Sequence, residues 1–173
     1  MKKVLTILLA LTPLAFADDE IAWGPPDNGM RLGLALDQTE RPPILRVLIQ
    51  NTSETARTIS LHWSTGCALI YPLGFTFTAI SPEGSSVVVV DRVSANLPLI
   101  GVACPIDSKV DPGASYEFTL KLTGLVNEYS PPSEPTTLDS LLKAGYVLRV
   151  SADLFGNTPH WMLISGELRL PKQ

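Results

Sequence analysis

The sequence predicts an all-β fold in which two sheets pack face to face. Three observations support this fold class: short runs rich in Val, Ile, Leu, Thr and aromatic residues, turn signals between the runs, and apolar–polar alternation within several of them. Successive side chains of a strand point to opposite faces of a sheet, so alternation places one face on a core and the other in water. Together these observations predict an immunoglobulin-like two-sheet β-sandwich.

The predicted strands are residues 30–36, 44–50, 57–63, 75–80, 87–93, 115–122, 146–154 and 160–170. The turns between them are rich in Gly and Pro, as at residues 81–84 and 111–113. In the third run Ile59, Leu61 and Trp63 share one face, which we expect to lie in the core. The same pattern predicts a core-facing row in two other runs: Tyr116, Phe118, Leu120 and Leu122, then Tyr146, Leu148, Val150 and Ala152.

One short helix is expected near residues 137–144. Thr137 can cap it, and Leu138, Leu141 and Leu142 form an apolar stripe at helical spacing. Gly145 can end it. We expect this helix to cover one open end of the sandwich.

The N-terminus has the three-part layout of a secretory signal peptide. Lys2 and Lys3 precede an apolar run over residues 4–14, and Ala15-Phe16-Ala17 matches a cleavage site. A membrane anchor is the alternative, but the run is short for a hydrocarbon core of about 30 Å. We therefore expect residues 1–17 to be removed and residues 18–173 to form a single β-sandwich domain, secreted or periplasmic.

Charge argues against several classes of partner. The chain carries 13 basic and 17 acidic residues, and the predicted signal peptide holds two of the lysines and no acid, so the mature part has a net charge of −6. No basic stripe occurs, whereas nucleic-acid phosphates and anionic membrane surfaces require clustered Lys and Arg. We expect no nucleic-acid binding and no membrane insertion after signal removal.

Two cysteines occur in the mature part. An even count in an exported chain predicts a disulfide between Cys67 and Cys104. The alternatives are two separate thiols, or half of a metal site completed by His62 and His160.

The order of motifs resembles bacterial immunoglobulin-like domains, and among them the BsuPI-type proteinase-inhibitor domain and its exported relatives. A strand ends in Asn51-Thr52-Ser53 before the next opens at Ile59, residues 111–113 lead into Tyr116-Glu117-Phe118, and residues 143–146 lead into a further strand. The resemblance spans about residues 23–170. It implies a sandwich and, as an expectation, inhibition of a peptidase, although the disulfide and the helix depart from the simplest version of that pattern.

Few residues could carry chemistry. His62 and His160 are each followed by tryptophan, and with Met30 or Met162 they could bind copper, or each could be a surface histidine beside a packed aromatic. Hydrolysis by serine would need an assembled nucleophile and base, and no nucleophile-elbow motif occurs. We expect no enzyme activity, no cofactor and no metal, with a copper-binding or hydrolytic protein as a distant alternative.

Asn51-Thr52-Ser53 also matches an N-glycosylation acceptor, but a tight turn is the favoured interpretation because the signal peptide has a bacterial character.

The function expected is a non-catalytic binding module that contacts another exported or envelope protein. Two loops could present the contact: residues 97–103, with Leu97, Leu99 and Ile100, and residues 127–136, with Tyr129, Pro131 and Pro132. The first could instead be a buried edge segment, and the prolines could serve only to prevent edge pairing. A structural accessory domain of the cell envelope, without a discrete ligand site, is the alternative function.

Overall fold

The computed structural model describes residues 20–64, 71–72, 74–91, 104–131, 133–156 and 160–170; for residues 62–64, 71–72, 104–106 and 155–156 it describes the backbone alone. The predicted signal peptide over residues 1–17 lies outside this part of the chain. The elements in order are β1 (Ala22–Trp23), β2 (Met30–Asp37), β3 (Ile44–Asn51), β4 (Arg57–Ser64), β5 (Tyr71–Pro72), β6 (Phe75–Ile80), β7 (Ser86–Asp91), β8 (Cys104–Val110), β9 (Ser115–Lys121), η1 (Leu122–Gly124), β10 (Leu125–Asn127), α2 (Leu138–Lys143), β11 (Val147–Gly156) and β12 (Trp161–Ile164). The prediction of an all-β fold with a short helix is confirmed.

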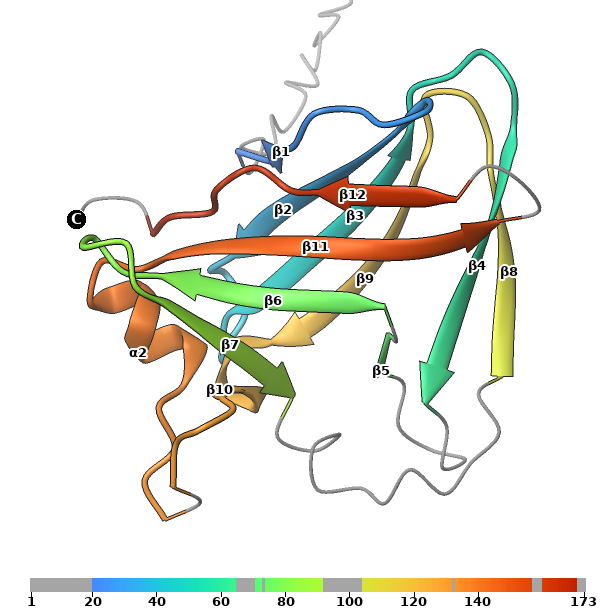
Figure 1. Ribbon diagram of the computed structural model, residues 1–173. Coiled ribbons are helices and arrows are strands. Elements are labelled where there is room, and N and C mark those ends of the chain that lie inside the picture. Colours follow the sequence, from blue (N-terminus) through green and yellow to red (C-terminus); the bar gives the residue numbers. More distant parts are fainter. Residues whose placement is uncertain are drawn as a thin grey trace, which may run out of the picture.

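The strands form two antiparallel sheets, visible as two layers in Figure 1. The smaller sheet has the order β1-β2-β3-β9, and the larger has the order β10-β7-β6-β11-β4-β5. Strand β11 organises the larger sheet, because it pairs with β6 along its first part and with β12 and β4 farther on. Strand β8 adds to the larger sheet by pairing with β4.

The core lies between the sheets and is built from the alternating faces that the sequence indicates. In β4, Ile59 and Leu61 are buried as predicted, while the side chain of Trp63 is outside the described part. Of the row predicted over residues 115–122, Tyr116, Phe118 and Leu120 in β9 are only half-buried, with Phe118 meeting Phe75 edge to face at 5.1 Å between ring centroids, and Leu122 just after β9 is fully buried. The other fully buried large side chains include Met30, Leu32, Leu34, Leu45, Ile49, Phe77 and Trp161.

Helix α2 confirms the local signals in its sequence. The Thr137 hydroxyl accepts a hydrogen bond from the Ser140 backbone N–H at 3.2 Å, which is the N-cap interaction. The three leucines of the stripe are buried, and the helix packs against β10, η1 and β6. Gly145 follows with φ +90°, a backbone conformation that favours glycine. No described helix is long and apolar enough to cross a membrane.

Two strand predictions are corrected. Strand β8 was not expected, because its sequence Cys-Pro-Ile-Asp-Ser-Lys-Val contains proline and the polar run Asp107-Ser108-Lys109; it pairs only with β4 in the described part, and a strand at a sheet edge tolerates proline. The predicted strand over residues 160–170 is wrong as a single element, because β12 ends at Ile164 and only an isolated bridge between Leu168 and Leu148 follows.

Candidate functional site

Of the residues predicted to form binding loops, the structure describes two, Tyr129 and Pro131. Leu97, Leu99, Ile100 and Pro132 lie outside the described residues. The candidate site is therefore the Tyr129 loop, which we define as residues 127–136 between β10 and α2.

The Tyr129 loop is anchored at both ends. Its first residue extends β10, which pairs with β7, and Val126 forms a β-bridge with Thr137 across the base of the loop. The Asn127 backbone N–H donates to the Thr136 carbonyl at 2.8 Å, closing the loop just above that bridge. The next residue after the bridge, Leu138, is fully buried as the first residue of α2. The loop therefore leaves and re-enters the core at neighbouring points.

Hydrogen bonds between residues two or three positions apart also fix the interior of the loop. The Asn127 side-chain oxygen accepts from the Tyr129 backbone N–H at 3.0 Å, which is an Asx turn. The Asn127 carbonyl accepts from both the backbone N–H and the hydroxyl of Ser130, at 3.0 and 2.8 Å. Farther on, the Glu134 N–H donates to the Pro131 carbonyl at 3.0 Å.

This frame holds Tyr129 out in solvent. Its side chain is 82% exposed, the most exposed of the large hydrophobic side chains described. Glu128, Pro131 and Glu134 of the same loop are exposed too, so the loop presents an aromatic ring and two carboxylates to solvent. A tyrosine offers apolar area and a hydroxyl at a small cost in conformational entropy, which makes it an effective contact residue.

Of the residues considered for copper, the structure describes the side chains of Met30, Met162 and His160. Met30 lies in the core with no exposed surface, whereas Met162 is 71% exposed on β12. His160 is exposed, with its Nε2 against a carboxylate oxygen of Asp153, and the neighbouring Trp161 is 1% exposed. His160 is thus the surface histidine beside a packed aromatic that the sequence allowed. The side chain of His62 lies outside the described part, in which no group of three or more His, Cys, Asp or Glu could hold a metal.

The predicted disulfide falls partly outside the described residues. Cys104 opens β8, where its backbone pairs with that of Trp63, and Cys67 is not described. The Cys67–Cys104 bond stays a prediction.

Asn51 is structural. Its side chain is fully buried, and its amide nitrogen donates to the carbonyls of Thr55 and Val110 at 2.8 and 2.9 Å. Its side-chain oxygen accepts from the backbone N–H and the hydroxyl of Ser53 at 2.9 and 2.7 Å. The nitrogen that glycosylation would modify is therefore enclosed, and the tight-turn interpretation is confirmed.

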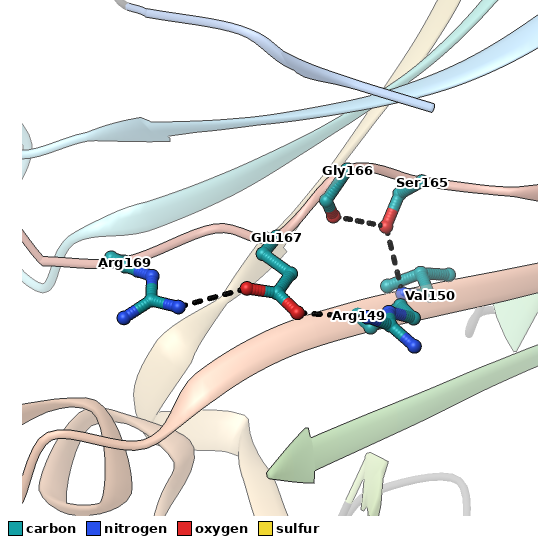
Figure 2. A network of polar contacts seen from close by, with 6 residues as sticks. All are labelled: Arg149, Val150, Ser165, Gly166, Glu167 and Arg169. Carbon is teal, nitrogen blue, oxygen red and sulfur yellow. Dashed lines mark hydrogen bonds and ion pairs between the residues drawn. The ribbon is translucent and has the colours of Figure 1, made fainter. Parts of the chain in front are cut away.

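A β-bulge explains why the last predicted strand is interrupted. The Ser165 N–H donates to the Val150 carbonyl at 2.8 Å, but the next paired residues are Leu168 and Leu148, so one extra residue is inserted after β12. The Ser165 hydroxyl accepts from the Val150 N–H at 2.9 Å and donates to the Gly166 carbonyl at 2.8 Å (Figure 2). The Ser165 hydroxyl thus accepts the hydrogen bond from Val150 that a backbone carbonyl would accept in a regular strand pair. Gly166 within a predicted strand was the available signal for this bulge.

The bulge also organises a charged cluster. The Glu167 carboxylate accepts from Arg149 at 2.8 Å and from Arg169 at 2.9 Å, and Figure 2 shows it between the two guanidinium groups. The hydrogen bond from Arg169 and then that from Arg149 hold the pKa of Glu167 below its ordinary value.

A groove that no sequence prediction covered lies beside this cluster. It has a volume of about 820 Å³ and is lined by the segment before and within β1, the end of β2 and the segment after the bulge. Its lining residues are Glu20, Ile21, Ala22, Trp23, Leu36, Gln38, Thr39, Gly166, Glu167, Leu168, Arg169 and Leu170. No sequence signal marks it, because it forms where three separate chain segments meet at one edge of the sandwich.

A scan against protein-family models and a search among curated proteins find no match to this chain, so the resemblance to the BsuPI-type domain remains an expectation from sequence motifs.

Proposed function

We propose that this chain is a non-catalytic binding module that contacts another exported or envelope protein through the Tyr129 loop. The observation that carries the proposal is the exposure of Tyr129, at 82%, on a loop whose two ends are fixed to the core. Tyrosine is enriched among residues that dominate binding energy at interfaces. A loop already held in one conformation loses less entropy on binding, which favours affinity.

The negative charge of the Tyr129 loop indicates which kind of partner surface it would contact. Glu128 and Glu134 are exposed on the same loop as Tyr129, and the whole chain has a net charge of −4. A complementary partner presents Lys or Arg around an apolar pocket, and such pairs associate faster at low salt. The resemblance to an inhibitor domain makes peptidases the first partners to test.

The decisive experiment compares three proteins in capture from the exported fraction of the source cells. These are the wild type, Tyr129→Ala, and Met162→Ala as a matched control with a similarly exposed apolar side chain on β12. The captured protein is then purified, and its dissociation constant is measured with each variant. We expect Tyr129→Ala to bind about tenfold or more weakly and Met162→Ala to bind as the wild type does.

Equal binding by the wild type and Tyr129→Ala would refute the role of the loop. Capture of nothing by the wild type would favour a structural accessory domain of the envelope. If the captured protein is a peptidase, its turnover of a chromogenic substrate should fall with wild-type protein and recover with Tyr129→Ala.

We also propose that the chain is exported and that its signal peptide is removed. N-terminal sequencing of exported material should begin at Asp18, and its intact mass should match a chain with the Cys67–Cys104 disulfide. Exported material that retains Met1, or two thiols that react in the folded and unreduced protein, would contradict these points.

A further inference from the structure

Asn28 and Gly29 form a two-residue turn at the start of β2, and we call residues 27–30 the Asn28 turn. The Asp27 and Met30 backbones exchange hydrogen bonds of 2.7 and 2.9 Å across it, and the φ angles of Asn28 and Gly29 are +46° and +80°. Positive φ at both central residues is the type I′ geometry, for which Asn-Gly is a preferred sequence. Asn28 is exposed, and the Gly29 N–H has no hydrogen-bond acceptor among the described residues.

The other asparagines of the described part lack this combination. The N–H that follows Asn51 belongs to Thr52 and donates to a carbonyl at 2.7 Å, and the Asn51 side chain is buried. The N–H that follows Asn127 belongs to Glu128 and donates to a carbonyl of β7 at 3.1 Å. Both following residues carry a side chain that hinders approach to the nitrogen, whereas glycine carries none. Asn28-Gly29 is also the only Asn-Gly pair in the sequence.

We propose that Asn28 is a site of spontaneous deamidation through attack by the Gly29 nitrogen. A bond forms between this nitrogen and the Asn28 Cγ, the Cγ–Nδ2 bond breaks, and the amide nitrogen leaves as ammonia with the Gly29 proton. Water then opens the resulting succinimide at either carbonyl, which gives aspartate or isoaspartate, and nothing is oxidised or reduced. Asparagine is among the thermolabile residues, and here its attacking nitrogen is not held by another group.

The turn geometry slows this reaction without preventing it. Closure of the succinimide ring requires rotation about the backbone of Asn28, and the two hydrogen bonds between Asp27 and Met30 oppose that rotation. The folded chain should therefore react at Asn28 more slowly than the unfolded chain. It should still react there faster than at Asn51 or Asn127, where the following N–H must first leave its acceptor.

Deamidation would loosen the contact between the Asn28 turn and β12. The Asn28 side-chain amide donates to one oxygen of Asp27 at 3.0 Å, and the other Asp27 oxygen accepts from the Met162 N–H at 3.3 Å. The Asn28 carbonyl accepts from the Trp161 indole at 3.5 Å. A carboxylate at this position replaces the donor with a negative charge beside Asp27, and the two charges repel. Isoaspartate also adds a methylene to the main chain of a two-residue turn, which shifts both contacts.

The test incubates the purified chain in mildly alkaline buffer and identifies the products by proteolytic digestion and mass spectrometry. Methylation by an isoaspartyl methyltransferase distinguishes isoaspartate from aspartate. We expect product to form at Asn28 about tenfold or more faster than at Asn51 or Asn127, because release of one hydrogen bond before attack slows a reaction by about that factor. In the same buffer with urea, the rate at Asn28 should rise.

Two variants connect the modification to its structural effect, with exchange of the Met162 amide followed by NMR. Asn28→Gly keeps a sequence that suits a type I′ turn and has no side-chain amide to lose, so its Met162 exchange should stay constant during the incubation. In the wild type this exchange should become several-fold faster as product accumulates. Asn28→Asp carries the charge of the product from the start, and we expect its Met162 amide to exchange faster than that of Asn28→Gly.

The inference is overturned if Asn28 reacts no faster than Asn51 and Asn127 in the folded chain. It is also overturned if the deamidated chain and the fresh chain show the same exchange at Met162. Neither measurement involves the Tyr129 loop, so such a failure would leave the proposed binding role of that loop unaffected.

Discussion

Two asparagines in this protein make the same local turn with opposite consequences. The side-chain oxygens of Asn51 and Asn127 each accept the backbone N–H two residues ahead, from Ser53 at 2.9 Å and from Tyr129 at 3.0 Å. Asn51 is fully buried and also donates to two carbonyls, so its turn joins β3 to the end of β8. Asn127 is half-buried, and its turn displays Tyr129 to solvent. An Asx turn is therefore set by local sequence, whereas its role depends on what packs against it.

The largest expected effect is at Asn51. Asn51→Ala leaves the carbonyls of Thr55 and Val110 without their donor in a buried place, and we expect a loss of about 2–3 kcal/mol in the free energy of unfolding. Asn51→Asp should lose at least as much at neutral pH, because it sets a carboxylate against both carbonyls. Urea unfolding measures both variants, and a loss below about 0.5 kcal/mol in either would show that the buried turn does not differ from an exposed one.

Asn127→Ala removes one hydrogen bond of a partly solvated turn. Its backbone bonds to Thr136 and Ser130 persist, so we expect a loss of only about 0.5–1 kcal/mol. The same variant should speed amide exchange at Tyr129, because that N–H loses its acceptor. If Asn127→Ala lowers the free energy of unfolding in urea as much as Asn51→Ala does, the contrast between the two turns is wrong.

Asp37 provides a charged version of the turn at the end of β2. Its Oδ1 accepts from the Thr39 hydroxyl at 2.6 Å and from the Thr39 N–H at 2.9 Å, and these bonds hold the pKa of Asp37 below its ordinary value. A lowered folded-state pKa gives stability that is present above the unfolded pKa, about 3.9, and is lost as pH falls through the folded value.

We therefore expect the wild type to lose stability relative to Asp37→Asn as the pH falls from about 3.9 through the folded-state pKa of Asp37. The Asn variant keeps an acceptor oxygen but does not titrate. Carbon-detected NMR titration of the Asp37 carboxyl gives the pKa directly, and a midpoint at or above 3.9 would contradict the expectation.

The smallest effect on stability is expected at Tyr129. The ring is 82% exposed, so Tyr129→Ala should change the free energy of unfolding by no more than about 0.5 kcal/mol. A larger loss in the free energy of unfolding, measured by heat or urea, would mean that the Tyr129 ring packs on its own loop. The stability of this variant also validates the binding comparison, since weaker binding cannot then be attributed to unfolding.

Strands with clean alternation were predictable because a half-buried strand must alternate. Ile59, Leu61, Leu148 and Val150 are core residues as their spacing indicated. Strand β8 escaped prediction because Pro105 and the polar run Asp107-Ser108-Lys109 obscure its alternation, whereas an edge strand tolerates proline and pairs along its length with β4. The bulge at Ser165 escaped as well, although the buried apolar residues change there from odd positions, Trp161 and Leu163, to an even one, Leu168, as the hydrogen-bond register shifts by one.

The sequence alone determined the class of fold, the capped helix α2 and the tight turn at Asn51. Each depends on contacts between residues a few positions apart, or on a periodicity that any half-buried strand must show. Only the tertiary structure decided that Asn51 is enclosed, that Tyr129 is exposed and that a groove opens at Leu36. These depend on which distant segments meet: Val110 reaches Asn51, and the segment after β12 passes β1 and the end of β2. Burial is a property of the assembled sheets, so no local pattern specifies it.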